Sequence, residues 1–467
     1  MARNGRRTAL PRMLCVAMSV ALAGCDAGPV FKGPVFPFAA SFASRPAGAP
    51  ALLENTDWWT RFDDPVLDRL VEAALAGNLD LAEAGERVRE AEALARSIPE
   101  PAALTGEAGA GRRGGRAVAD ADGARADLGF DWLLDPFGER RAQLRAAGGR
   151  VEIADAELDA ARLLLLSSIA TAYVDLRFQQ RSLQLRRAEL SSRGKTLEQV
   201  RRLEAGSAAT RLDIVRAEAL VSETRSLIPG YEAAIRVQQN RIAVLLGQTP
   251  GRPDQALAGI GRGQPLADMP AEIGIPADLL RNRPDIRIAE RLYYVAVAEV
   301  GVETARLYPK LSLGGEISLS SFGGTTGMDY FFGPTLRLPA LPDGSRRAGV
   351  AARQSRARQA LTAWQSAVLE AIGEVESALV EYSASLSSAG AARKTVRLYG
   401  EAVDLTRQLI GRDGATVSDL LDAEQSVAAA NILLARNLRD LGRNFVALNV
   451  SLGSGSGYRK DAPDAGG

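Results

Sequence analysis

Two stretches of the chain alternate apolar and polar residues at a period of two. In residues 124–134 the even positions are apolar, as at Phe130, whereas the odd positions are mostly polar or glycine, as at Asp131. This alternation predicts a β-strand with one apolar face, and about ten residues is the length of a tilted membrane-spanning strand. Residues 102–111 form a weaker partner strand, and residues 112–123 are expected to be a polar loop between the two.

The same pattern returns in the second half of the chain. Apolar Leu313 alternates with polar neighbours such as Ser312 in residues 310–319, and residues 330–338 alternate again after an expected loop at 322–329. A soluble antiparallel sheet packed on helices remains an alternative to strands in a membrane. Four strands cannot close a barrel alone, because the smallest spanning barrels need about eight. Open sheet edges are not tolerated in lipid, so several protomers would have to share one barrel.

Each predicted β-hairpin is followed by a long stretch with helical periodicity. Residues 137–228 and 343–462 contain no proline, and apolar residues recur in both at spacings of three and four. Helices of about 50 residues with one apolar stripe need neighbours along their whole length, as in a coiled coil. We therefore expect long helices that fold back on themselves, with the stripes serving as packing surfaces.

The points of reversal are two glycine-containing segments that begin at Gly206 and Gly414. A glycine where the apolar register restarts indicates a helix end. Residues after the first segment recur 206 positions later: Asp213, Ala217 and Glu218 return as Asp419, Ala423 and Glu424. This recurrence predicts two copies of one structural unit.

The repeat gives a predicted domain organisation. The first copy covers residues 57–250, with a starting helix, a β-hairpin at about 101–135 and a helical hairpin at about 138–247. A linker follows at 251–282. The second copy covers 283–452, with a β-hairpin at about 309–339 and a helical hairpin at about 343–452, and 453–467 is expected to be a flexible tail.

Local signals refine these boundaries. Asp64 followed by Pro65 is typical of a helix start, with the aspartate as cap and the proline at the first position. Gly77 and Asn78 indicate a break in that helix. Pro229, followed by a glycine, is expected to kink or end the returning helix of the first copy.

The N-terminus predicts export and lipidation. A basic start at residues 3–12 precedes a short apolar run at 13–23, and Leu22-Ala23-Gly24-Cys25 resembles a bacterial lipoprotein cleavage box. This predicts a signal peptide at residues 1–24, covalent lipid on Cys25 and an extended tether over 25–56. An ordinary signal peptide with an accidental cysteine is the alternative. After cleavage Cys25 is the single cysteine, so no internal disulfide is possible.

Composition narrows the possible chemistry. The chain has 467 residues, a net charge of +1 and no histidine. The charge gives no sign of nucleic-acid binding, and the lack of histidine excludes Ser-His-Asp and Cys-His nucleophiles and most zinc chemistry. Gly194-Lys195-Thr196 lacks the upstream glycine of a P-loop, because position 189 is Glu. Hydrolysis by a pair of carboxylates remains possible, but nothing in the sequence singles out such a pair. We therefore predict no catalytic, metal-binding or cofactor-binding residues, and a protein that is not an enzyme.

Several short strings together resemble the TolC-type outer-membrane factors, in particular the NodT/OprM-like lipoprotein branch that serves tripartite RND efflux pumps. The strings are Trp58-Trp59-x-x-Phe62-x-Asp64-Pro65, Leu133-Leu134-Asp135-Pro136-Phe137-Gly138, Arg283-Pro284-Asp285-Ile286, Tyr308-Pro309-x-Leu311-Ser312-Leu313 and Ser418-Asp419-Leu420-Leu421-Asp422-Ala423. The resemblance implies an α+β membrane protein and a homotrimer. Long helical hairpins would form an α-barrel, and the β-hairpins would form one shared trimeric β-barrel.

The resemblance also implies a function. The trimer would lie in the outer membrane, lipid-anchored and extending into the periplasm, as a passive exit duct for small molecules or drugs. Its partners would be a periplasmic adaptor (membrane fusion) protein, an inner-membrane RND transporter and outer-membrane lipid. Two alternatives stay open: an exit duct for secreted protein, and a periplasmic coiled-coil lipoprotein scaffold. A scaffold needs no strand with a lipid-compatible face.

Five residues are candidate functional positions. Asp419 and Asp422 lie three apart and so share one helix face. The resemblance puts them at the periplasmic gate as acidic rings, whereas helix capping is the alternative role for Asp419. The family pattern ties the second tip to the aspartate of the first, here Asp213, through a Tyr and an Arg; the Tyr is missing, and Arg412 is the expected partner. Cys25 is the lipidation site.

Overall fold

The computed structural model describes residues 26–39, 41–44, 57–115, 118–252, 257–259, 263–267, 277, 282–339, 342–410 and 414–456. The predicted signal peptide, the lipidation site Cys25 and the proposed tip residue Arg412 lie outside the described residues. So does most of the predicted linker at 251–282 and the end of the predicted tail.

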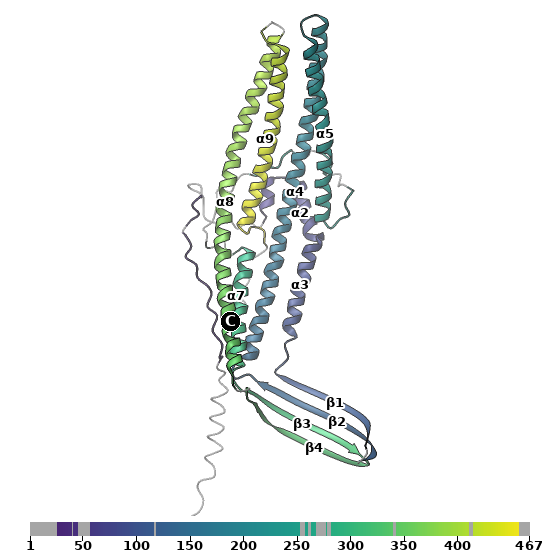
Figure 1. Ribbon diagram of the computed structural model, residues 1–467, viewed down its shortest axis with the longest axis vertical. Coiled ribbons are helices and arrows are strands. Elements are labelled where there is room, and N and C mark those ends of the chain that lie inside the picture. Colours follow the sequence, from purple (N-terminus) through teal and green to yellow (C-terminus); the bar gives the residue numbers. More distant parts are fainter. Residues whose placement is uncertain are drawn as a thin grey trace, which may run out of the picture. The chain divides into compact units, whose positions relative to one another are not determined.

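A helix, a β-hairpin, a long helix and a shorter return helix follow one another twice along the chain (Figure 1). The elements are η1 Trp58–Phe62, α2 Pro65–Gly77, α3 Leu79–Arg96, β1 Ala102–Gly115, β2 Val118–Leu134, α4 Glu139–Ala205, α5 Arg211–Leu245, α7 Pro284–Ala305, β3 Lys310–Phe322, β4 Thr325–Arg337, α8 Gly344–Ile410 and α9 Val417–Ser451. Helices α4 and α8 each have 67 residues, and α5 and α9 each have 35. The predicted internal repeat of a β-hairpin and a long helical hairpin is thus confirmed. No helix within the described residues is long and apolar enough to cross a bilayer.

The first helix begins and breaks where the sequence predicts. Asp64 is the N-cap of α2 and accepts a hydrogen bond from the Val66 backbone nitrogen at 3.0 Å, with proline at the first helical position. Asn78 separates α2 from α3, and its side-chain oxygen accepts from the Leu81 nitrogen at 2.9 Å. Of the two outcomes expected at Pro229, a kink or a helix end, the end is wrong, because α5 continues through that residue.

The four strands form one antiparallel sheet in the order β1-β2-β3-β4, with the two hairpins joined where β2 pairs with β3. Both predicted loops are too long. Strands β1 and β2 extend through most of residues 112–123, and β3 and β4 meet at a two-residue turn of Gly323 and Gly324. Their φ angles of 58° and 84° match the left-handed turn that suits the twist of a hairpin, so pairing continues beyond the apolar alternation.

The register places the side chains of the sheet on two unlike faces. Residues directly opposite in neighbouring strands share a face. The apolar face comprises Leu104, Leu128, Phe130, Trp132, Leu313, Ile317, Leu319, Met328, Tyr330 and Phe332. The polar face comprises Thr105, Glu107, Arg125, Asp127, Asp131, Glu316, Ser318 and Asp329, together with two aromatic residues, Phe322 and Phe331. The predicted two-faced hairpins are confirmed, and the apolar face runs across all four strands.

Two compact units make up the chain, and each contains segments from both repeats. The strand-bearing unit comprises Met1–Phe36, Arg87–Asp155 and Ile288–Ser366; the helical unit comprises Pro37–Glu86, Ala156–Arg287 and Ala367–Gly467. The division does not follow chain order, because the strands of the two repeats pair with each other and their helical hairpins share a core. A repeat is therefore a unit of sequence here and not an independent body.

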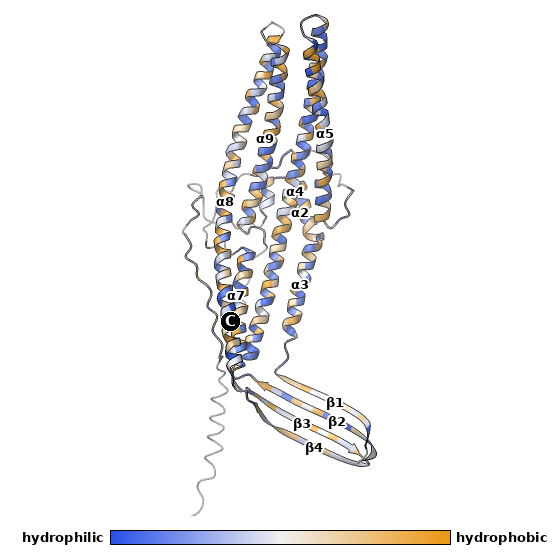
Figure 2. Cartoon of the chain, in the orientation of Figure 1, coloured by the Kyte–Doolittle hydropathy of each residue, from blue (hydrophilic) through white to orange (hydrophobic). Residues whose placement is uncertain are grey.

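The core of the helical unit is aromatic at its centre. Phe445 of α9 packs edge-on against Phe62, with ring centroids 5.1 Å apart, and against Trp58 at 6.3 Å. Trp58 and Tyr173 are fully buried. Hydrophilic and hydrophobic residues are interspersed along the whole length of the long helices, as Figure 2 shows. These contacts explain why the Trp-Trp-x-x-Phe string precedes the first helix.

A buried polar chain crosses this core. The Tyr173 hydroxyl donates to Asp64 Oδ2 at 2.5 Å, and Arg177 Nη2 donates to the Tyr173 oxygen at 2.8 Å. Burial, followed by the bond to Asp64, raises the pKa of Tyr173. The tyrosine thus stays protonated and links an anion to a cation that is 1% exposed.

The expected flexible tail is partly wrong. Helix α9 ends at Ser451, and Gly453, with a φ of 74°, follows the C-cap residue Leu452 and closes a Schellman motif. In this motif Gly453 N donates to Val450 O and Ser454 N donates to Asn449 O. Ser454 and Ser456 are buried, and Arg283 Nη1 donates to the Ser451 carbonyl at 2.8 Å. The chain is therefore fixed to at least residue 456, because α9 ends against the start of α7.

Candidate functional site

The first hairpin tip joins α4 to α5 through residues 206–210. Helix α4 ends in a Schellman motif in which Ala208 N donates to Leu203 O and Ser207 N donates to Glu204 O, both at 2.8 Å. The left-handed residue is Ser207, with φ 60°, and not the neighbouring glycine from which the sequence predicted the turn.

Helix α5 then starts with a capping box, which fixes the candidate residue Asp213. Thr210 Oγ1 accepts from the Asp213 nitrogen at 3.3 Å, and Asp213 Oδ2 accepts from the Thr210 nitrogen at 2.9 Å. The same carboxylate oxygen accepts from the Thr210 hydroxyl at 2.7 Å. These side-chain and backbone bonds hold the pKa of Asp213 below its usual value. Its proposed partner Arg412 lies beyond the described residues, so that pairing stays a prediction.

The second tip repeats this cap. Thr416 Oγ1 accepts from the Asp419 nitrogen at 3.2 Å, and Asp419 Oδ2 accepts from the Thr416 nitrogen at 2.8 Å and from its hydroxyl at 2.7 Å. The hydroxyl and then the backbone bond lower the pKa of Asp419. The N-cap itself is Thr416, so Asp419 has the reciprocal place in a capping box. This assigns it a structural role and leaves a gate role untested.

Asp422 stands apart from the cap. It is exposed, one helical turn after Asp419, which is exposed as well. The backbone carbonyl of Asp422 accepts from the Ser426 hydroxyl at 2.9 Å. Both carboxylates thus lie on an exposed face of α9, as their spacing predicts, and only Asp419 belongs to the cap.

The opposite face of α9 attaches the second tip to the first hairpin. Val417 and Leu421 are buried in a cluster with Val200 of α4 and with Ile214 and Ala217 of α5. These α9 positions are four apart and therefore lie on one face. The apolar cluster fixes the beginning of α9, and with it the placement of Asp419 and Asp422 on the exposed face.

One turn further along α9, Glu424 makes a buried junction between the hairpins. Its Oε1 atom accepts from Arg407 Nη2 at 2.7 Å, from Thr196 Oγ1 at 3.0 Å and from Ser192 Oγ at 3.3 Å. Glu424 is 6% exposed. Its second oxygen, Oε2, is also buried and makes no hydrogen bond within the described part of the chain. Glu424 therefore joins α4, α8 and α9 at a single carboxylate.

Sequence reasoning missed this role for Glu424. The sequence shows that Glu218 recurs as Glu424, but no feature of the sequence around either residue indicates that only Glu424 is buried. The hydroxyl of Thr196 lies 228 residues earlier in the chain. A sequence repeat identifies equivalent positions in the two copies, whereas a contact between the copies can be predicted only from the way they pack.

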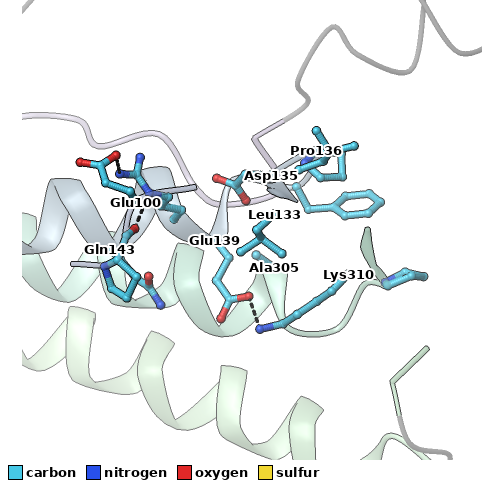
Figure 3. Close-up of a pocket in the computed structure, with 13 residues that line it drawn as sticks. Glu100, Leu133, Asp135, Pro136, Glu139, Gln143, Ala305 and Lys310 are labelled. Atoms are coloured by element: carbon cyan, nitrogen blue, oxygen red, sulfur yellow. Dashed lines mark hydrogen bonds and ion pairs between the residues drawn. The ribbon is translucent and has the colours of Figure 1, made fainter. Parts of the chain in front are cut away.

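The strand-bearing unit has a small pocket where the strands meet the helices (Figure 3). Its volume is about 160 Å³, and Glu139 and Lys310 meet in its wall. Glu139 accepts from Lys310 Nζ at 2.7 Å and from Arg306 Nε at 3.1 Å. Burial raises the pKa of Glu139, but the two cations outweigh it and leave the pKa below its usual value. Glu139 is paired with both cations, so we interpret these residues as stabilising the connection between the strands and the helices.

The described residues offer no sign of metal chemistry. They include no group of three or more His, Cys, Asp or Glu side chains placed to hold an ion.

Comparison with known proteins identifies relatives along nearly the whole chain. The family model described as outer membrane efflux protein matches residues 70–248 and 275–454, one match in each repeat. Nodulation protein T of Rhizobium leguminosarum bv. trifolii is 34% identical over 451 residues, covering 94% of this chain and 96% of that protein. The toluene efflux pump outer membrane protein TtgF of Pseudomonas putida is 29% identical over 430 residues, covering 86% of this chain and 85% of that protein.

A solved structure agrees with these relatives. The outer-membrane channel OprN superposes with a TM-score of 0.84 at 29% identity, covering 92% of this chain and 100% of that one. The resemblance to TolC-type outer-membrane factors and the expected outer-membrane location are confirmed. The chain belongs to the outer membrane efflux protein family.

Proposed function

We propose that three copies of this chain form the passive exit duct of a tripartite efflux pump. Each copy contributes four strands to one barrel in the outer membrane and two helical hairpins to a periplasmic tunnel. A periplasmic adaptor protein contacts the tips, and an inner-membrane RND transporter supplies the energy. Lipid on Cys25 is an accessory anchor.

The two-faced open sheet carries this proposal. Apolar side chains on one face are left in contact with solvent, among them Leu104 at 71% and Tyr330 at 80% exposed. The sheet order leaves one edge of β1 and one edge of β4 unpaired by any strand that the structure describes. An apolar face favours lipid, and backbone edges in lipid need partners. Three four-stranded sheets joined edge to edge satisfy both needs with twelve strands.

The polar face of the sheet lines the interior of the proposed barrel, which is filled with water. Charged and hydroxyl side chains line it, including Glu107, Asp127 and Glu316. A water-filled duct needs no dedicated pocket for its cargo, so it suits small solutes. A relative named for toluene efflux supports a small-molecule substrate. A coiled-coil scaffold gives no reason for an apolar face across four strands.

Planar-bilayer recording of the purified protein tests the proposal. We expect ohmic conductance without any nucleotide. Phe130→Arg puts a charge on the apolar face and should cost about 2–4 kcal/mol near the bilayer centre, with a large loss of assembled channels. The matched control is Asp131→Ser, one residue away on the polar face, which should assemble as the wild type does. A wild-type protein without conductance, or equal assembly of the two variants, would contradict a membrane barrel.

A further inference from the structure

The segment that follows Cys25 has a defined seat in the strand-bearing unit. Asp26 Oδ2 lies 2.7 Å from Arg145 Nη2 of α4, and Asp26 Oδ1 accepts from the Gly28 nitrogen at 3.1 Å. The Ala27 nitrogen donates to the Phe137 carbonyl at 3.2 Å. Three contacts therefore fix the first residues after the cysteine, and both oxygens of the Asp26 carboxylate are engaged.

Glycines make room for this seat. A Cβ atom on Gly28 would lie 2.6 Å from the Cα atom of Gly301 on α7. Gly138 has a φ of 81°, and a Cβ atom there would lie 2.9 Å from Asp26 Oδ1. Side chains at these positions would push the segment away. The close approach is therefore built into the sequence at three places that lie far apart along the chain.

Arg145 is the cation that pairs with Asp26. The neighbouring Arg141 is occupied elsewhere, since its Nη2 atom donates to the Asp135 carbonyl at 3.2 Å and its Nε atom lies 3.8 Å from the Asp135 carboxylate. The side chains of Arg145 and Asp26 are 36% and 32% exposed. A half-buried ion pair on a segment already fixed by backbone bonds loses little entropy when it forms, unlike a pair between two mobile side chains.

We propose that Arg145 masks Asp26 as a sorting signal. In some bacteria an aspartate directly after the lipidated cysteine retains a lipoprotein in the inner membrane, which conflicts with the outer-membrane location of this chain. In this proposal, retention depends on a carboxylate that is free to be recognised. Here a guanidinium and a backbone N–H occupy it once the N-terminal segment is seated on α4. Folding thus cancels the retention signal, and this inference rests on the proposed lipidation of Cys25.

Membrane fractionation of full-length variants tests the mask. The host is one in which an unrelated lipoprotein beginning Cys-Asp stays in the inner membrane. Arg145→Gln should raise the inner-membrane fraction several-fold, whereas Arg141→Gln should distribute as the wild type does. Arg145→Lys keeps the positive charge and should restore the wild-type distribution.

A double variant separates sorting from misfolding. Asp26→Ser combined with Arg145→Gln removes both the signal and its mask and should return to the outer membrane. Failure of the double variant to return, or a wild-type distribution for Arg145→Gln, overturns the mask while leaving the duct untouched. Mass spectrometry of the N-terminal peptide reports the lipid. An unmodified Cys25 in the wild type would overturn the lipid anchor, and this inference with it.

Discussion

The two helical hairpins are equal in length and alike in their caps, but the second hairpin is attached to the first through a buried contact. Each hairpin has an arginine on its long helix paired with a glutamate on its return helix: Arg201 with Glu218 at 2.9 Å, and Arg407 with Glu424 at 2.7 Å. The side chain of Glu218 is 41% exposed, whereas that of Glu424 is 6% exposed. The same pair is therefore a surface contact in one copy and a buried junction in the other.

The surroundings explain this difference. The first hairpin closes on itself through Arg193, which binds Glu189 at 2.8 Å on its own helix and Thr224 at 2.8 Å on the return helix. The second hairpin instead receives hydroxyl donors for Glu424 from α4 of the first. Sequence repetition thus produced an unsymmetrical pair, in which the first hairpin supports the tip that bears the candidate gate residues.

The largest expected effect comes from truncating Glu424, with its counterpart Glu218 as the comparison. Glu424→Ala would leave Arg407 and two hydroxyl groups without their acceptor, at a cost of about 2–3 kcal/mol in the free energy of unfolding. Glu218→Ala removes an exposed pair and should cost less than about 0.5 kcal/mol. Denaturant unfolding followed by circular dichroism in detergent measures both. Equal losses for the two variants would refute the supporting role of the first hairpin.

The caps should behave alike in both hairpins. Thr210→Ala and Thr416→Ala each remove one capping box, and each should lower the free energy of unfolding by about 1 kcal/mol. The corresponding Thr→Ser variants keep the hydroxyl and serve as controls. A loss at only one tip would show that the caps differ in strength, contrary to their matching geometry.

Acid should weaken both caps together. The pKa values of Asp213 and Asp419 are lowered in the folded chain. Their contribution to the free energy of unfolding is therefore complete above the unfolded pKa of about 4, and it is lost as the pH falls through the lower folded pKa. Asp213→Asn and Asp419→Asn should each flatten the decline of stability below about pH 4. An unchanged acid profile in both variants would mean that the carboxylates do not stabilise the helix starts.

The smallest effect on stability belongs to Asp422. Asp422→Asn changes an exposed carboxylate outside the cap, so the unfolding midpoint should stay within error. If Asp419 and Asp422 form acidic rings at the tunnel entrance, the variant should still reduce cation selectivity, measured as a shift of reversal potential under a salt gradient. Asp213→Asn should leave selectivity unaltered. A wild-type reversal potential for Asp422→Asn would count against the gate.

Local patterns in the sequence predicted the parts of the structure that local forces decide. Period-two alternation identified both faces of the sheet, and Asp64 with Pro65 marked the start of α2. The extent of the strands was underestimated, because β1 and β2 continue through glycine-rich and charged residues where backbone pairing holds without apolar alternation. The two-glycine turn at Gly323 was likewise hidden inside an expected loop.

Contacts between distant segments could not be predicted in this way. The burial of Glu424 depends on hydroxyl groups of another helix, and the seat of Asp26 depends on Arg145 and on glycines in two other elements. The buried end of α9 depends on Arg283. Each residue looks ordinary in its local sequence, and its role follows from packing.

The number of chains in the assembly tests the central claim most directly. A four-stranded sheet with two open edges and an apolar face requires partners, and the proposed barrel supplies them as three copies in a closed ring. Native mass spectrometry of protein extracted from outer membranes in mild detergent should give one species with three times the mass of the mature chain. A monomer or dimer that still conducts in bilayers would contradict the shared barrel.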